Sequence, residues 1–210
     1  MNVLKKIFFP DRNKQLAQRK FRKAVRGLGP KDVAIDCGAN IGDFTAKMAA
    51  RGARVHAFEP NPYAYAELEK RFAHSPNVVL YPCAVGASAG KVELHLHKQH
   101  EEDPVKWSVG SSLFPEKGNV SEQDTLVVDQ IDLPAFIMEL ACPIGLLKID
   151  IEGAEVALLH KLISDGLIAD IQSVFVEMHD DKIPSLVEGS AELRKRLIDG
   201  ELSNVDLHWK

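Results

Sequence analysis

Acidic side chains in this sequence follow short apolar runs at four places. Asp36 follows VAI, Glu59 follows VHAF and Asp150 follows LLKI. The fourth run, SVFV, is followed by Glu177 and then, two residues later, by His179. Apolar runs of this length are typical of buried strands, and the strands of a parallel sheet present their carboxyl ends to one ligand site. Carboxylates at such an edge could bind a ligand's hydroxyl groups, hold a divalent cation, or take a proton as a general base.

The first of these acids precedes a glycine-rich turn, DCGANIG. Gly38 and Gly42 can adopt positive φ and let the backbone approach a ligand, which then lies over the N-terminus of the next helix. A dinucleotide-binding loop has the pattern G-x-G-x-x-G, whereas this turn is Gly-x-Asn-x-Gly with Asn40 in the middle. An acid beside the turn suits a positively charged ligand better than a pyrophosphate. Asp36 therefore argues against an NAD-dependent oxidoreductase.

The second acid completes a nucleoside-binding pattern. Glu59 lies about 20 residues beyond the first glycine of the turn, where an acid can accept both hydroxyls of a ribose. The turn and the acid together describe an adenosine-type ligand that needs no phosphate. S-adenosylmethionine, which carries a sulfonium and an ammonium, is the natural candidate.

The remaining acids are expected to converge on one rim of the sheet, together with His179. Three interpretations are open. Asp150 or His179 could be a general base for an acceptor hydroxyl. Alternatively, Asp150, Glu152, Glu177 and His179 could hold Mg²⁺ or Mn²⁺, which would lower the pKa of that hydroxyl; a metal is compatible with this set but is not the favoured interpretation. Finally, Asp150 could cap the following helix, with Glu155 stabilising its first turn.

These residues need a sheet that brings them together, and the pattern of the chain predicts one. Apolar runs alternate with helical stretches, which is typical of an α/β fold with a doubly wound, mostly parallel sheet. The expected core strands are 33–36, 54–59, 77–85, 145–150 and 171–179. The expected helices are 44–51, 63–73, 154–164 and, in the tail, 190–199. Two inserted strands, 91–97 and 124–133, are expected between the third and fourth core strands, and a short strand is expected at 204–209.

The charge distribution separates the N-terminus from the rest. Residues 1–31 contain ten Lys or Arg and one acid, although the whole chain of 210 residues has a net charge of -4. We expect a basic helical extension over 1–30 and a single domain over 31–210. The extension could contact an anionic surface, but its apolar side, formed by Leu16, Phe21 and Val25, favours packing on the domain.

The lack of a recognisable targeting signal and the spacing of the cysteines lead us to expect a cytoplasmic protein. The sequence shows no transmembrane run and no signal peptide. Its cysteines, Cys37, Cys83 and Cys142, have neither metal-ligand nor disulfide-framework spacing. A homo-oligomer is compatible with the sequence.

Residues 31–180 resemble the FkbM-type family of S-adenosylmethionine-dependent methyltransferases. The resemblance is carried by VAIDCGANIGDFT, HAFEPNP, CAVG, GSSL and, above all, LLKIDIEGAE followed by FVEMH. It implies the seven-stranded, Rossmann-like sheet of class I methyltransferases and O-methylation of a hydroxyl on a small molecule or glycan, with S-adenosylhomocysteine as product. That fold class ends in an antiparallel hairpin. Only one strand is evident after His179, so the hairpin is expected to be shortened.

The resemblance also implies roles for individual residues. The implied cofactor-binding residues are Asp36, Gly38, Ala39, Asn40, Gly42, Glu59, Ala84, Val85, Ser111 and Ser112. The implied catalytic residues are Asp150, Glu152, Glu177 and His179. A binding or regulatory protein that has lost catalysis is an alternative, as is a nucleic-acid methyltransferase, although the sequence has no Asn/Asp-Pro-Pro-Tyr motif.

Overall fold

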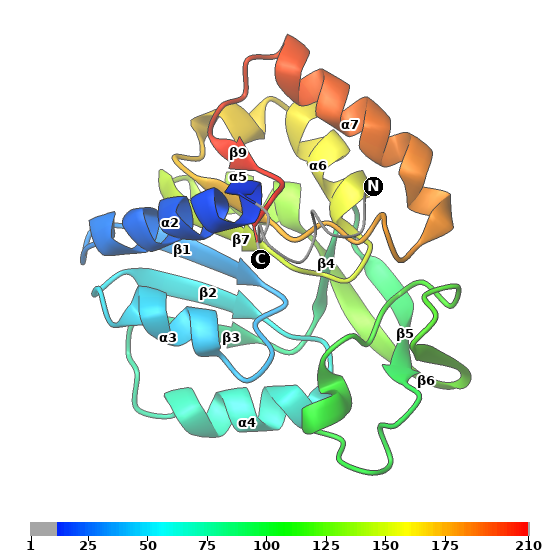
Figure 1. Ribbon diagram of the computed structural model, residues 1–210. Coiled ribbons are helices and arrows are strands. Elements are labelled where there is room, and N and C mark those ends of the chain that lie inside the picture. Colours follow the sequence, from blue (N-terminus) through cyan, green and yellow to red (C-terminus); the bar gives the residue numbers. More distant parts are fainter. Residues whose placement is uncertain (1–11, 210) are drawn as a thin grey trace.

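The computed structural model describes residues 12–209 (Figure 1). The start of the expected basic extension, with Lys5 and Lys6, therefore lies outside the described residues.

A six-stranded sheet forms the centre of the fold, in the order β3-β2-β1-β7-β8-β9. Its strands are β1 (Val33–Cys37), β2 (Arg54–Phe58), β3 (Val78–Tyr81), β7 (Ile144–Ile149), β8 (Val174–Val176) and β9 (Val205–Asp206). Each neighbouring pair runs parallel, which confirms the predicted sheet. The chain moves outward from β1 to β3 and then returns to β7 on the other side of β1. This reversal creates a crevice at the carboxyl ends of β1 and β7, where ligands bind in such sheets.

Helices cover both faces of the sheet. They are α2 (Arg12–Gly27), α3 (Asp43–Ala49), α4 (Pro62–Phe72), α5 (Leu133–Leu140), α6 (Glu155–Ser164) and α7 (Val187–Asp199). Short 3-10 turns lie at Lys106–Ser108, Leu167–Asp170 and Pro184–Leu186. Side chains alternate between the two faces of a strand. Leu147 accordingly packs in one buried cluster with residues of α5, α6 and α7, whereas Leu146 packs in another with residues of α2 and α3.

A second, three-stranded sheet lies beside the first (Figure 1). Its strands are β4 (Ala84–Gly86), β5 (Gly90–His97) and β6 (Val120–Asp132), in the order β4-β6-β5. β5 and β6 are the expected inserted strands, and they pair antiparallel. The prediction of one strand over 77–85 was wrong, because β3 ends at Tyr81 and β4 joins the second sheet. Pro82 lies between them and has no N–H to continue the ladder.

The C-terminal end of the sheet is short. β9 has two residues and pairs parallel with β8, through Val174 with Val205 and Phe175 with Asp206. No antiparallel hairpin follows β8 within residues 12–209. The one strand predicted after His179 is therefore present as β9, and it joins the sheet parallel to β8.

Helix α2 packs on the domain through part of its predicted apolar side. Phe21 and Val25 are buried, but Leu16 is 51% exposed, and Ala17 is buried instead. The Phe21 ring lies 5.0 Å from that of Trp209 and 5.2 Å from that of Phe175, measured between centroids. Aromatic contacts thus hold the first described helix against the sheet and the end of the chain.

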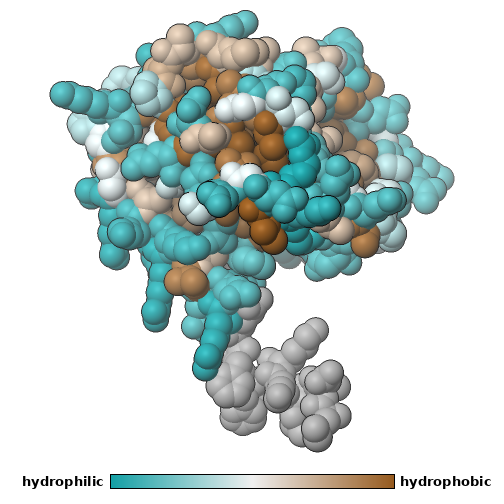
Figure 2. Space-filling view, turned by 90° about the horizontal axis from the view of Figure 1, so that it is seen from above, coloured by the Kyte–Doolittle hydropathy of each residue, from teal (hydrophilic) through white to brown (hydrophobic). Residues whose placement is uncertain are grey.

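The outer surface is mixed in character. Seen from above, hydrophobic side chains appear in separate groups between hydrophilic ones (Figure 2). None of the helices within residues 12–209 is long and apolar enough to cross a membrane.

Candidate active site

A cavity of about 680 Å³ lies where the carboxyl ends of the strands meet the inserted segment. Most of the predicted site residues line it, namely Gly38, Ala39, Asn40, Glu59, Ala84, Val85, Ser111, Ser112, Asp150, Glu152 and Glu177. Asp36, Gly42 and His179 are not among the lining residues. The cavity is also lined by residues that the sequence analysis did not select, including Phe21 and Arg22 of α2 and Lys148 of β7.

Asp36 is a structural partner of Lys148 rather than a wall of the cavity. Asp36 is fully buried, and its carboxylate lies 3.1 Å from the Lys148 ammonium and accepts a hydrogen bond of 2.7 Å from Thr45. The two charged residues are paired in the register of β1 and β7. Lys148 also donates to the backbone carbonyls of Cys37 and Gly38. The expectation that Asp36 attracts a cationic ligand directly is therefore wrong, because Lys148 balances its charge and holds the turn.

The glycine-rich turn has three residues with positive φ. They are Gly38 at 77°, Asn40 at 49° and Gly42 at 88°. A Cβ on Gly38 would overlap the backbone oxygen of Asp150, so this glycine lets the turn pack against the end of β7. Asparagine tolerates positive φ better than most residues, which explains why it can occupy the middle position.

Glu59 is a buried carboxylate at the end of β2. One of its oxygens accepts the backbone N–H of Asn40 at 2.7 Å, and the other accepts that of Asn61 at 2.8 Å. Burial raises the pKa of Glu59 to about 7, and these two hydrogen bonds oppose the shift only in part. Each oxygen keeps a further lone pair that can accept a hydrogen bond from a ligand in the cavity.

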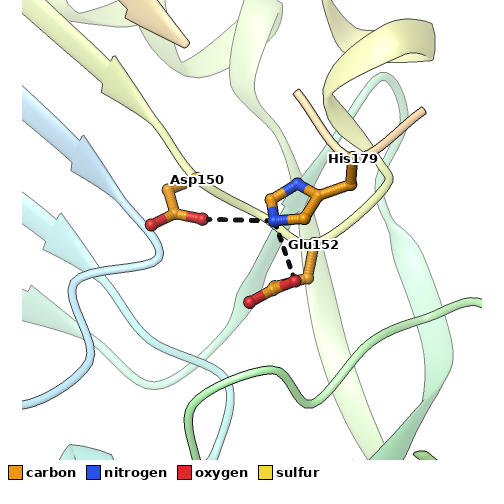
Figure 3. Close-up of side chains that lie close together, drawn as sticks. All are labelled: Asp150, Glu152 and His179. Carbon is orange, nitrogen blue, oxygen red and sulfur yellow. Dashed lines mark ion pairs between the residues drawn. The ribbon is translucent and has the colours of Figure 1, made fainter. Parts of the chain in front are cut away.

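The acidic rim converges on His179, as the sequence predicted (Figure 3). The imidazole Nε2 lies 2.9 Å from Glu152, 3.4 Å from Glu177 and 3.9 Å from Asp150. His179 is fully buried, whereas the side chains of Asp150 and Glu152 are 22% and 18% exposed. The carboxylates therefore form the cavity surface, and the imidazole lies behind them.

Glu155 holds the imidazole from the other side. One of its oxygens accepts the backbone N–H of His179 at 2.9 Å and lies 3.1 Å from Nδ1 of the same residue. Its second oxygen accepts the backbone N–H of Gly153. Glu155 is thus more than a first-turn partner of the helix. Asp150 is not the helix cap, because α6 begins at Glu155 after Ala154 and has no side-chain cap.

Charge interactions fix the protonation of the rim. Burial alone would lower the pKa of His179, but the ion pairs with the surrounding glutamates outweigh it and raise the pKa to about 11. In the same way burial would raise the pKa of Glu152, yet His179 and Lys117 lower it to about 2. An imidazolium that keeps its proton at neutral pH cannot accept one from a hydroxyl. His179 is also fully buried and does not line the cavity, so this geometry does not favour it as a general base.

Two lysines of the site were not anticipated. The sequence does contain an indication of Lys148, since it is the one charged residue inside the apolar run LLKI. No sequence pattern indicates Lys117, because it lies in a polar loop, 35 residues before its ion-pair partner Glu152. Its ammonium also donates to the Gly110 carbonyl and is almost fully buried.

Solved structures of methyltransferases match this chain at low sequence identity. A precorrin-6y C5,15-methyltransferase from Geobacter metallireducens GS-15 has 11% identity and a TM-score of 0.43, covering 87% of this chain and 70% of that one. A putative rRNA-methylase from Clostridium thermocellum has 12% identity and a TM-score of 0.45, covering 89% of this chain and 82% of that one.

The sequence has a much more specific match. The 31-O-demethyl-FK506 methyltransferase FkbM of Streptomyces tacrolimicus is 28% identical over 176 residues, covering 73% of this chain and 67% of that protein. A family model described as the methyltransferase FkbM domain matches residues 36–201, a range that includes every site residue predicted from the sequence. The chain therefore belongs to the FkbM methyltransferase family.

Proposed function

We propose that this protein is an S-adenosylmethionine-dependent O-methyltransferase that acts on a hydroxyl of a small molecule or sugar. The observation that carries the proposal is a single cavity lined by Glu59 and by the rim of Asp150, Glu152 and Glu177. Glu59 can accept hydrogen bonds from a cofactor, while the rim can hold an acceptor hydroxyl.

The residues around Glu59 fit this cofactor. Its carboxylate keeps two lone pairs for the two ribose hydroxyls, and the Gly38–Asn40 turn lies beside it through the Asn40 N–H. Buried Ala84 and Val85 supply an apolar surface for an adenine. The cavity volume of about 680 Å³ lies within the range of small-molecule sites, about 300–1,000 Å³.

The rim supplies what the acceptor needs. When bound, S-adenosylmethionine provides a sulfonium-activated methyl group. The acceptor oxygen forms the new O–CH₃ bond as the S–CH₃ bond breaks, the electron pair of that bond stays on sulfur, and the hydroxyl proton passes to the rim. Orientation of the two reactants accounts for much of the rate in such a step, and a rim of fixed carboxylates supplies it.

Calorimetric titration with S-adenosylmethionine and S-adenosylhomocysteine tests the proposal. We expect both to bind with one site per chain, and a folded protein that binds neither would refute the proposal. Transfer of a labelled methyl group should then be measured on a panel of hydroxylated acceptors. Cofactor binding without transfer to any acceptor would favour the alternative of a binding or regulatory protein.

A further inference from the structure

We infer that Asp150, Glu152 and His179 form a binding site for one divalent transition-metal ion, with Glu177 beside it. The role of the ion rests on the proposed function, whereas its binding does not. The sequence did not favour a metal, and the arrangement of the side chains is what supports one.

The separations between the ligand atoms suit a single ion. One ligand atom from each of Asp150, Glu152 and His179 lies within 4.8 Å of the others. Metal–ligand bonds of about 2.1 Å place two ligands of one ion roughly 3 to 4 Å apart. The Nε2 atom of His179 lies 2.9 Å from the Glu152 oxygen and 3.9 Å from the Asp150 oxygen. Figure 3 shows all three side chains directed toward one point.

The orientation of His179 is an independent observation. This residue is fully buried, and its Nε2 makes no well-directed hydrogen bond with any residue between 12 and 209, although carboxylates surround it. Its Nδ1 faces Glu155, which also accepts the backbone N–H of His179. Without a cation the surrounding carboxylates keep this imidazole protonated; a metal ion would displace the proton on Nε2 and bind the lone pair, which is aimed at the rim. A carboxylate behind a histidine is how many proteins orient that residue toward a metal.

The charge of the cluster also favours a cation. Five carboxylates gather there, and only two ammonium groups face them. The carboxylates belong to Asp36, Asp150, Glu152, Glu155 and Glu177, and the ammonium groups to Lys117 and Lys148. With a neutral imidazole, three negative charges remain formally unbalanced. Buried charges need to be compensated, and a bound divalent ion would reduce the three unbalanced negative charges to one.

The ligand types and the accessible side indicate which ion binds and what it does. An imidazole nitrogen with carboxylate oxygens suits Mn²⁺, Fe²⁺ or Zn²⁺ better than Mg²⁺ or Ca²⁺. Asp150, Glu152 and Glu177 line the cavity, so the remaining coordination positions face the acceptor. An ion there would lower the pKa of the acceptor hydroxyl and ease its deprotonation.

Titration of chelator-treated full-length protein with Mn²⁺ alone tests the binding. Free Mn²⁺ is followed by its electron paramagnetic resonance, and bound metal is counted by mass spectrometry. We expect one ion per chain. Asp150→Asn and Glu152→Gln should each weaken binding at least tenfold. Asp43→Asn is the matched control, since Asp43 also lines the cavity but pairs with Arg71 away from the rim.

Circular dichroism shows whether Asp150→Asn and Glu152→Gln are folded. If one of them is not, the other still tests the site. Absence of binding for Mn²⁺, Fe²⁺ and Zn²⁺ would overturn the inference, as would wild-type affinity in a folded Asp150→Asn or Glu152→Gln. Cofactor titration on the same samples separates the two proposals. Metal binding without cofactor binding refutes only the proposed function. Full turnover in protein shown to be metal-free refutes only the role of the ion in the reaction.

Discussion

Lys148 and Glu59 are both buried at the cavity, but their charges are held in different ways. The Lys148 ammonium lies 3.1 Å from Asp36, and this attraction raises its pKa although burial opposes the shift. Glu59 receives only backbone N–H groups from Asn40 and Asn61, and its pKa rises to about 7. Lys148 therefore keeps its charge at all ordinary pH values, whereas Glu59 changes charge near neutrality.

Loss of the Lys148 ammonium should destabilise the fold. Lys148→Met leaves the fully buried Asp36 without its cation, and breaking a buried pair in this way costs about 3–5 kcal/mol of unfolding free energy. Urea denaturation measures the loss, and adding Asp36→Asn should recover part of it. Lys195→Met, on the exposed side of α7, is the control and should change stability by less than about 0.5 kcal/mol. A loss below about 1 kcal/mol for Lys148→Met would contradict the structural role of this pair.

Cofactor affinity should depend on pH through Glu59. Below its pKa of about 7 the protonated carboxyl loses an acceptor for the ribose, so affinity should fall by up to about tenfold per pH unit. Glu59→Gln should bind more weakly and show no such slope between pH 5.5 and 8 in calorimetric titrations, with Glu69→Gln on α4 as the control. The same raised pKa means that protonation favours the folded state, so stability from this group is lost as the pH rises toward about 7. A pH-independent wild-type affinity would contradict the assigned contact.

The acids of the site could be predicted because they follow strands, while their partners could not. Asp36, Glu59 and Asp150 each follow an apolar run, and parallel strands bring such positions to one edge. The role of Asp36 was misjudged because its neighbour in the sheet, Lys148, is more than a hundred residues away in sequence. Lys117 reaches the rim from a loop whose path no periodicity encodes.

At the scale of elements, the strongly periodic segments were predicted well and the irregular ones were not. Strands β1, β2 and β7 and helices α4 and α6 lie where the apolar pattern placed them. Helix α5 was missed because its eight residues follow β6 directly, without a loop. Asp132 ends the strand and also caps the helix by accepting the N–H of Ala135. One residue thus serves two elements, which a pattern search treats separately.

The contact between the turn and α4 gives a test at this scale. Gly42 precedes α3 with a φ of 88°, and a Cβ there would overlap the side chains of Phe72 and Leu68 in α4. Gly166 has a φ of 73° but open space around it, so Gly166→Ala measures the backbone strain alone, about 1–2 kcal/mol. Gly42→Ala should cost about 1–3 kcal/mol more, because the core must also move. Equal losses of unfolding free energy for Gly42→Ala and Gly166→Ala, in thermal or urea unfolding, would contradict this contact, because they would mean that α4 accommodates the added methyl group at no energetic cost.

At the scale of the whole molecule, the two ends of the described chain meet at the cavity. Phe21 and Arg22 of α2 line it, and so does Trp209. Lys20 pairs with Asp206 of β9 at 2.9 Å, which ties the same helix to the last strand. The basic residues of α2 therefore belong to a helix that forms part of the domain, an arrangement the apolar pattern of the segment had favoured.

Removal of one aromatic side chain should weaken this junction. Phe21→Ala deletes a buried ring that packs on Phe44, Phe175 and Trp209, and it should cost about 3–5 kcal/mol of unfolding free energy. Leu16→Ala on the same helix is the matched control; because Leu16 is half exposed, it should cost less than about 0.5 kcal/mol. Denaturant unfolding compares the two, and similar losses would mean that α2 is not part of the cooperative unit.

Residues between 18 and 26 line the same cavity as Trp209, and this affects when the cavity can form during protein synthesis. A chain still emerging from a ribosome has made its glycine-rich turn and Glu59 early, but the wall that includes Trp209 is made much later. The pocket is therefore completed only when nearly all of these residues are free to fold. Nascent chains halted before β9 should not hold a ligand in the way that a chain extended beyond Trp209 does, so ligand binding indicates that the pocket is complete.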